Sequence, residues 1–106
     1  MVTTITDDNF DQEVLQSDSL VFVDCYAEWC SPCKALKPLL LELEDQNKTL
    51  NLGLLDIDHN PSLAKRLKVA SIPKVVVFRN GEEITSISGV RSKADYQEVI
   101  DTFSIS

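Results

Sequence analysis

Basic residues are few in this chain, and their scarcity limits what it can bind. Only 10 lysines and arginines face 17 aspartates and glutamates among 106 residues, which gives a formal net charge of -7. Nucleic-acid backbones and anionic membrane surfaces attract positively charged proteins, so neither is an expected partner. The acidity is expected to serve solubility instead.

Long apolar runs and targeting signals are also missing from the sequence. No stretch approaches the roughly 18 apolar residues of a membrane span. The N-terminal stretch MVTTITDDNF has neither the basic region nor the apolar region of a secretory signal. We therefore expect a cytoplasmic protein that does not insert into a membrane.

Metal ligands are scarce as well. His59 is the single histidine, and Cys30 and Cys33 form the one CxxC motif among three cysteines. A structural zinc site needs four ligands, and no second CxxC supplies the rest. The odd number of cysteines argues against a framework of structural disulfides. Because a nucleotide-binding motif is missing too, we expect no bound metal or cofactor.

The apolar pattern predicts one domain, residues 1–106, in which strands and helices alternate. Strands joined by helices imply parallel pairs, and the hairpin signal Asn80-Gly81 adds an antiparallel pair. We therefore expect an α/β fold with a central mixed five-stranded sheet flanked by four helices. The predicted strands end at residue 5 or span 20–25, 52–57, 75–78 and 83–88, and the predicted helices span 7–17, 31–47, a short stretch from Pro61 and a stretch after Ser92.

A few residues give finer expectations about these elements. Thr6 is predicted to cap the first helix, and Asn60 to cap the short helix that begins at Pro61. Pro38 falls inside the helix at 31–47 and should kink it. Ile84, together with Ile87, breaks the strict alternation of the last strand, which predicts a bulge or an edge position there.

The stretch EWCSPCK, residues 28–34, raises the main question about function. Its two cysteines are compatible with a redox pair, half of a metal site or a structural bridge. Cys30 follows a strand and starts a helix, where the first N–H groups and the helix dipole favour the reactive thiolate. Cys33 lies one turn further along the same face and is expected to be less exposed. The expected Cα separation of about 5–5.5 Å is within the range of a disulfide.

Other distinctive stretches follow in order: VDCYAEWCSPCK, the helix-interrupting Pro38, IDHNP, SIPKVVVF, RNGE and the region of Gly89. On these stretches the chain resembles the thioredoxin family over nearly its full length. The resemblance implies the thioredoxin fold, with Cys30 as the attacking cysteine, Cys33 as the resolving cysteine and Asp24 as the proton acceptor. The position of Asp24 supports this independently, because a carboxylate ending a buried strand has a raised pKa unless it reaches solvent.

The resemblance also implies a surface on which substrate proteins dock. Pro73 matches the family's cis-proline beside the active site, and proline tolerates the cis form better than other residues do. The backbone at Ile72 would then be free to pair with an extended substrate. The residues expected on this surface are Trp29, Ser31, Pro32, Ile72, Pro73, Gly89 and Val90.

Some residues depart from the family's pattern. Ser31 replaces a glycine between the cysteines, and Lys74 replaces a common threonine after the proline. Leu54 stands where many members carry a lysine near the buried aspartate. Cys25 replaces a large apolar residue, and we interpret it as a small buried hydrophobe rather than a third redox thiol. His59 is expected in a solvated turn.

The motifs predict a protein-disulfide reductase of the thioredoxin type, with a redox-active Cys30–Cys33 disulfide. Its expected partners are disulfide-containing proteins and a separate thioredoxin reductase, flavin- and NADPH-dependent as in the family. The protein is expected to be a monomer. Two alternatives stay open: a relative biased toward disulfide oxidation or isomerisation, and a binding subunit that uses the fold as an interface.

Overall fold

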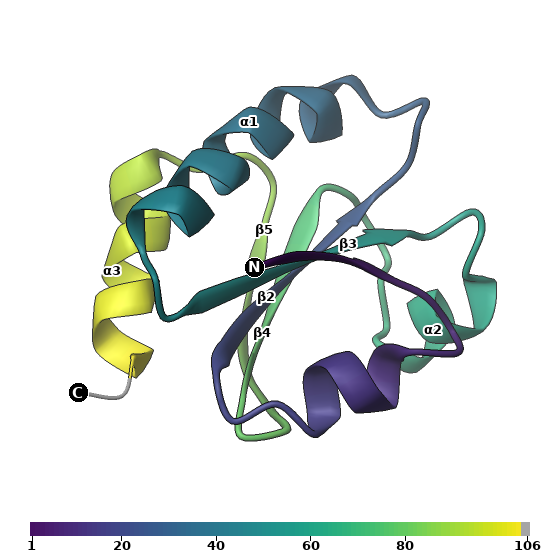
Figure 1. The fold of residues 1–106 in the computed structure, drawn as a ribbon. Coiled ribbons are helices and arrows are strands. Elements are labelled where there is room, and N and C mark those ends of the chain that lie inside the picture. The colour runs from purple at the N-terminus through teal and green to yellow at the C-terminus, as the bar shows by residue number, and fades with distance from the viewer. Residues whose placement is uncertain (105–106) are drawn as a thin grey trace.

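A mixed five-stranded sheet forms the centre of the computed structural model, which describes residues 1–104 (Figure 1). The strands lie in the order β1-β3-β2-β4-β5. The pairs β1/β3 and β3/β2 are parallel, whereas β2/β4 and β4/β5 are antiparallel. This confirms the mixed sheet predicted from the sequence. The strands are β1 (Val2–Ile5), β2 (Leu20–Tyr26), β3 (Leu50–Asp56), β4 (Lys74–Arg79) and β5 (Glu82–Ser88).

Helices cover both faces of the sheet. They are the π-helical turn η1 (Asp11–Leu15), α1 (Ser31–Gln46), α2 (Pro61–Arg66) and α3 (Lys93–Phe103). Figure 1 shows α1 and α3 on one face, and η1 and α2 on the other. Leu20 and Phe22 of β2 belong to the core under α1 and α3, whereas Val21 and Val23 belong to the core under η1 and α2. Because side chains alternate along a strand, the next two positions of β2 also serve different faces.

The turn between β4 and β5 is a tight hairpin, as the sequence predicts. Asn80 and Gly81 both have positive φ angles, 51° and 79°, which is typical of the turn that matches strand twist. The pairing of β4 with β5 shifts register between Val77 and Phe78. Ile84 is the extra residue of this bulge, so the irregularity predicted there is confirmed.

The first helical segment is shorter than the predicted helix 7–17. The Thr6 hydroxyl accepts a hydrogen bond from the Asn9 N–H at 3.2 Å, and the Asn9 side chain accepts one from the Thr6 N–H at 2.8 Å. Thr6 and Asn9 therefore stabilise the turn that precedes η1, whereas the N-cap of the helical segment is Phe10 and not Thr6 as predicted. The helix itself begins only after this turn, and Asp7 within the turn makes hydrogen bonds to another segment.

That segment is α2, whose cap comes from an unexpected residue. The Asn60 side chain makes no capping hydrogen bond to α2, although Asn60 holds the predicted N-cap position. The Asp7 carboxylate instead accepts from the Leu63 N–H at 2.9 Å. The Asn60 side chain accepts from the Asp7 N–H at 3.0 Å and donates to the Asp56 carbonyl at 3.0 Å. Asn60 therefore holds the predicted N-cap position, but Asp7 accepts the capping hydrogen bond, because the Asn60 amide group joins the N-terminal segment to the end of β3.

The long helix α1 begins directly after the CxxC motif's first cysteine. Cys30 is its N-cap residue, and Pro32 lies in the first turn, where a missing N–H costs no hydrogen bond. Pro38 lies inside the helix as predicted, and the kink there stays a prediction. Within residues 1–104, neither this helix nor any other has the length and apolar character needed to cross a bilayer.

Candidate active site

The two cysteines of the CxxC motif form a disulfide at the junction of β2 and α1. The Cα atoms of Cys30 and Cys33 are 5.3 Å apart, within the predicted range. The backbone N–H of Cys33 donates to the Cys30 sulfur at 3.2 Å, so the Cys30 side chain caps the helix. A sulfur in this position receives a peptide dipole and the positive end of the helix, which stabilises a thiolate once the disulfide is reduced.

Both cysteines are almost completely buried. Cys30 is 4% exposed and Cys33 is 2% exposed, so the predicted order of exposure holds by a small margin only. They form a small cluster with Ala27, against which Tyr26, Ile57 and Ile72 pack.

Asp24 is fully buried on the same face of the sheet as α1. Its neighbours across the sheet are Leu54 on β3 and Val75 on β4, and both are apolar. Within residues 1–104, neither carboxylate oxygen of Asp24 has a hydrogen-bonding partner. Burial raises the pKa of Asp24 to about 7, while the charge of Lys37 acts in the opposite direction. The alternative that Asp24 reaches solvent at the end of its strand is therefore wrong.

The Ile72-Pro73 peptide bond is cis, as the resemblance implies. The Gly89 N–H donates to the Pro73 carbonyl at 2.9 Å, which fixes the end of β5 against the start of β4. Ile72 packs on the cysteine cluster. The predicted residues Ile72, Pro73 and Gly89 therefore converge at the active-site end of the sheet, and Val90, 49% exposed, follows directly.

A shallow groove of about 320 Å³ lies beside the cysteines. It is lined by Trp29, Ile57 and the segment Val69–Ile72. Trp29 is 69% exposed, although it is the largest apolar side chain near the disulfide. Ser31 and Pro32 are exposed at the start of α1. Trp29 and Ile72 thus line one groove, and the docking role that the resemblance implies for them stays a prediction.

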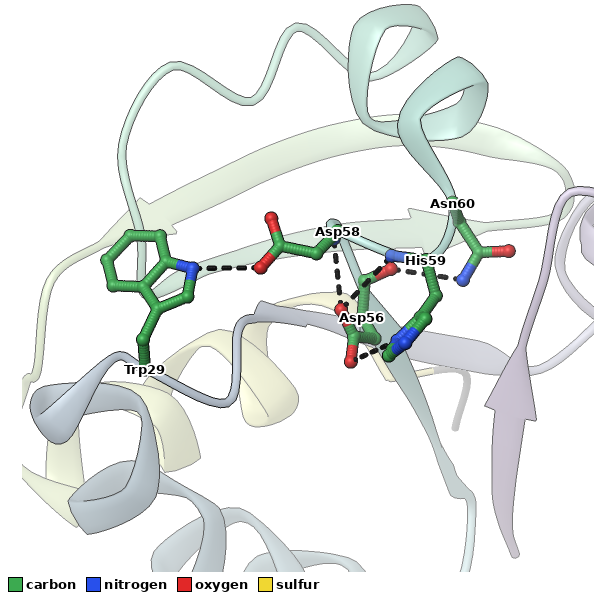
Figure 2. A network of polar contacts seen from close by, with 5 residues as sticks. All are labelled: Trp29, Asp56, Asp58, His59 and Asn60. Carbon is green, nitrogen blue, oxygen red and sulfur yellow. Dashed lines mark hydrogen bonds and ion pairs between the residues drawn. The ribbon is translucent and has the colours of Figure 1, made fainter.

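A polar network behind Trp29 was not predicted from the sequence (Figure 2). The Trp29 indole N–H donates to the Asp58 carboxylate at 2.8 Å. The Asp56 carboxylate accepts from the backbone N–H groups of Asp58 and His59, at 2.9 and 3.3 Å, and lies 2.8 Å from His59 Nδ1. The stretch DIDHN directly after a buried strand was the available signal for such a turn. The network fixes the loop that orients Trp29.

His59 and Cys25 largely match their predicted environments. The His59 side chain is 77% exposed, which confirms the solvated position, but its contact with Asp56 raises its pKa. Cys25 is completely buried on the face opposite Asp24. Burial, with a further contribution from the Asp24 charge, raises the pKa of the Cys25 thiol to about 12. Cys25 is therefore unsuited to thiolate chemistry at neutral pH.

Metal binding finds no support in this arrangement. In the part of the chain that the structure describes, no group of three or more His, Cys, Asp or Glu side chains is placed to hold a metal ion. Two cysteines that form a disulfide at the start of a helix, together with a buried carboxylate of raised pKa on the same side of the sheet, are typical of dithiol–disulfide oxidoreductases.

Comparisons with known proteins give the family. The thioredoxin family model matches residues 1–102. Thioredoxin from Rickettsia bellii is 38% identical over 102 residues, which cover 95% of this chain and 97% of that protein. Thioredoxin from Staphylococcus saprophyticus is 40% identical over 101 residues, covering 94% of this chain and 95% of that protein. The chain belongs to the thioredoxin family. It is a thiol–disulfide oxidoreductase that reduces protein disulfides, and neither alternative interpretation is favoured.

Proposed function

We propose that Cys30 and Cys33 divide the reduction of a protein disulfide between them. The Cys30 thiolate attacks one sulfur of the substrate disulfide, a mixed disulfide forms, and the bond between the two substrate sulfurs breaks. The electron pair of that bond leaves on the second substrate sulfur, which takes a proton from water. The hydrogen bond from the Cys33 N–H to the Cys30 sulfur supports this assignment, because it stabilises negative charge on Cys30.

Asp24 is proposed to accept the proton of the resolving cysteine. The Cys33 sulfur attacks the Cys30 sulfur of the mixed disulfide, and the Cys33 thiol proton passes to the Asp24 carboxylate. The bond from Cys30 to the substrate breaks, and the substrate sulfur leaves with the electron pair and is protonated from solvent. Asp24 and Cys33 line one cavity of about 60 Å³. A pKa of about 7 lets Asp24 accept and release a proton near neutral pH.

The groove beside the disulfide is proposed to hold the substrate backbone. An extended peptide on this surface would contact Trp29 on one side and pair with the backbone at Ile72 on the other. The apolar lining and the exposed indole support this role, because aromatic side chains contribute strongly to protein–protein contacts. The full proposed surface is Trp29, Ser31, Pro32, Ile72, Pro73, Gly89 and Val90.

A thioredoxin reductase returns two electrons to the oxidised pair, and we propose that this enzyme is flavin- and NADPH-dependent. A bifunctional thioredoxin reductase/thioredoxin from Mycobacterium leprae is 40% identical over 91 residues, which cover 85% of this chain and 20% of that protein. In that relative the two activities share one polypeptide, which supports a direct electron transfer between them. We further propose that residues 1–106 are one thioredoxin domain that acts as a cytoplasmic monomer. Light scattering and cell fractionation test the last two points.

The Cys30–Cys33 disulfide at the start of α1, with Asp24 buried beside it, carries this proposal. The test is NADPH-coupled reduction of insulin with candidate reductases. Cys33→Ser should trap mixed disulfides with substrates and Cys30→Ser should not, while Cys25→Ala serves as a control that keeps activity. A Cys30→Ser, Cys33→Ser double variant that still reduces insulin would refute the proposal.

A further inference from the structure

The residues paired with Asp24 across the sheet supply no positive charge. Its cross-strand neighbours on β3 and β4 are Leu54 and Val75, so the sheet surrounds the carboxylate with hydrocarbon. A carboxylate in such surroundings ionises only if another element provides a compensating charge. The ionisable groups near it on this side of the sheet are Cys33, Lys34 and Lys37 of α1, Tyr96 of α3, Tyr26 and Glu28 at and after the end of β2, and Asp56 at the end of β3.

Lys37 is the cation of this set that acts on Asp24. It lines the cavity of about 60 Å³ together with Asp24 and Cys33. Its charge lowers the pKa of Asp24 and so opposes the effect of burial. Lys34 lines the same cavity one turn earlier on α1, which makes it a natural point of comparison.

The Lys37 side chain is held in place by an aromatic ring. Its ammonium nitrogen lies 5.6 Å from the centroid of the Tyr26 ring, within the range of a cation–π contact. Tyr26 is the last residue of β2, two positions after Asp24, and therefore lies on the same face of the sheet. The ring thus holds the charge in the lining of the cavity that Asp24 also lines.

We propose that Lys37, held over the Tyr26 ring, is a positioning residue that sets the protonation of Asp24 and thereby the proton transfer from Cys33. The inference rests on the proposed role of Asp24 as the proton acceptor. The positive charge stabilises the carboxylate that must be present when the Cys33 thiol loses its proton. Helix α1 therefore contributes both the resolving cysteine and the charge that prepares its proton acceptor.

The direct test is an NMR titration of Asp24 in the reduced protein, in wild type and in variants of the exposed residues Lys37 and Lys34. Lys37→Met removes the charge but keeps the chain length, and we expect the pKa of Asp24 to rise by about half a unit. Lys37→Arg should restore the wild-type titration. Lys34→Met is the matched control, because it removes the same charge from the same helix and cavity lining, and it should shift Asp24 much less.

Two further variants test the geometry. Tyr26→Leu removes the ring that holds Lys37. The double variant Tyr26→Leu, Lys37→Met should shift the pKa of Asp24 by less than the sum of the two single-variant shifts, because both substitutions remove the same Lys37–Tyr26 contact. Leu54→Lys in the Lys37→Met background should lower the pKa of Asp24 again, since it places a cation directly across from Asp24 on β3. An Asp24 titration that is unchanged in Lys37→Met, or shifted equally by Lys34→Met, would overturn the inference.

A kinetic readout separates this inference from the role proposed for Asp24. One limb of the pH–rate profile for insulin reduction should depend on the ionisation of Asp24. In Lys37→Met, this limb should shift to higher pH by the same amount as the pKa of Asp24 measured by NMR. Asp24→Asn should remove that limb. If Asp24→Asn keeps the wild-type profile, the proposed role of Asp24 fails, whatever the titration shows for Lys37. If Asp24→Asn removes the limb but Lys37→Met leaves it in place, the role of Asp24 stands and that of Lys37 is overturned.

Discussion

Replacing Asp24 with asparagine is expected to stabilise the oxidised protein at pH 8 and to change its stability little at pH 4. Asp24 is completely buried without a protein partner among residues 1–104, and burial raises its pKa from 3.8 to about 7. Between these values the folded protein keeps a proton that the unfolded chain has lost. The free energy of unfolding therefore falls as the pH rises from about 4 to about 7.

The size of the effect follows from the two pKa values. At about 1.4 kcal/mol per pKa unit, the difference between 3.8 and about 7 corresponds to about 4 kcal/mol at pH 8. The stability difference between Asp24→Asn and wild type should thus grow by about 1.4 kcal/mol per pH unit across this window. Asparagine resembles the neutral acid in shape, so the two proteins converge where Asp24 is protonated.

Urea unfolding of the oxidised proteins, followed by circular dichroism from pH 4 to pH 8.5, measures this difference. The disulfide keeps Cys30 and Cys33 from titrating, and the pH dependence of the His59–Asp56 pair cancels because both proteins contain it. Asp18→Asn, at an exposed carboxylate, is the control and should follow the wild-type pH dependence. A stability difference that stays constant with pH would refute the assignment of a raised pKa to Asp24.

Three further predictions concern the cysteines and the docking surface. In the reduced protein, alkylation at neutral pH should label Cys30 first and leave the buried Cys25 unlabelled until the protein unfolds. Mass mapping of the labelled peptides measures this order, and faster labelling of Cys25 would contradict it. Ser31→Gly should make the reduction potential more negative by roughly 30–60 mV at most, if the hydroxyl stabilises the reduced form, and equilibration with glutathione measures it. An unchanged potential would leave Ser31 without a redox role. Asp58→Ala removes the 2.8 Å hydrogen bond to Trp29 and should raise KM for insulin about fivefold with kcat little changed; a loss of kcat alone would argue against a docking role.

The sequence predicted the parts of this site that depend on spacing along one element. Cys30 and Cys33 are one helical turn apart, so their separation followed from helix geometry alone. Asp24 was predicted to be buried because it continues an apolar strand, and the structure agrees. Fold and chemistry were therefore accessible from local patterns, together with the resemblance to the family.

Contacts between distant segments could not be predicted in the same way. The charge of Lys37 reaches Asp24 only because α1 packs over β2, and nothing in the spacing of these residues indicates it. The hydrogen bond from Trp29 to Asp58 joins positions 29 residues apart. Asn60 holds the predicted N-cap position, but its side chain makes no capping hydrogen bond to α2, because tertiary contacts decide which groups its amide binds.

The capping of α2 by Asp7 couples two regions that seem independent along the chain. A helix of six residues is too short to persist alone, so α2 depends on the carboxylate that receives the Leu63 N–H. Loss of the N-terminal segment should therefore destabilise α2, and we expect the amide hydrogens of α2 to exchange faster in its absence. The loop from α2 to the cis-proline forms one wall of the groove proposed to bind substrates. The first residues of the chain thus help to stabilise, from a distance, the surface proposed to bind partner proteins.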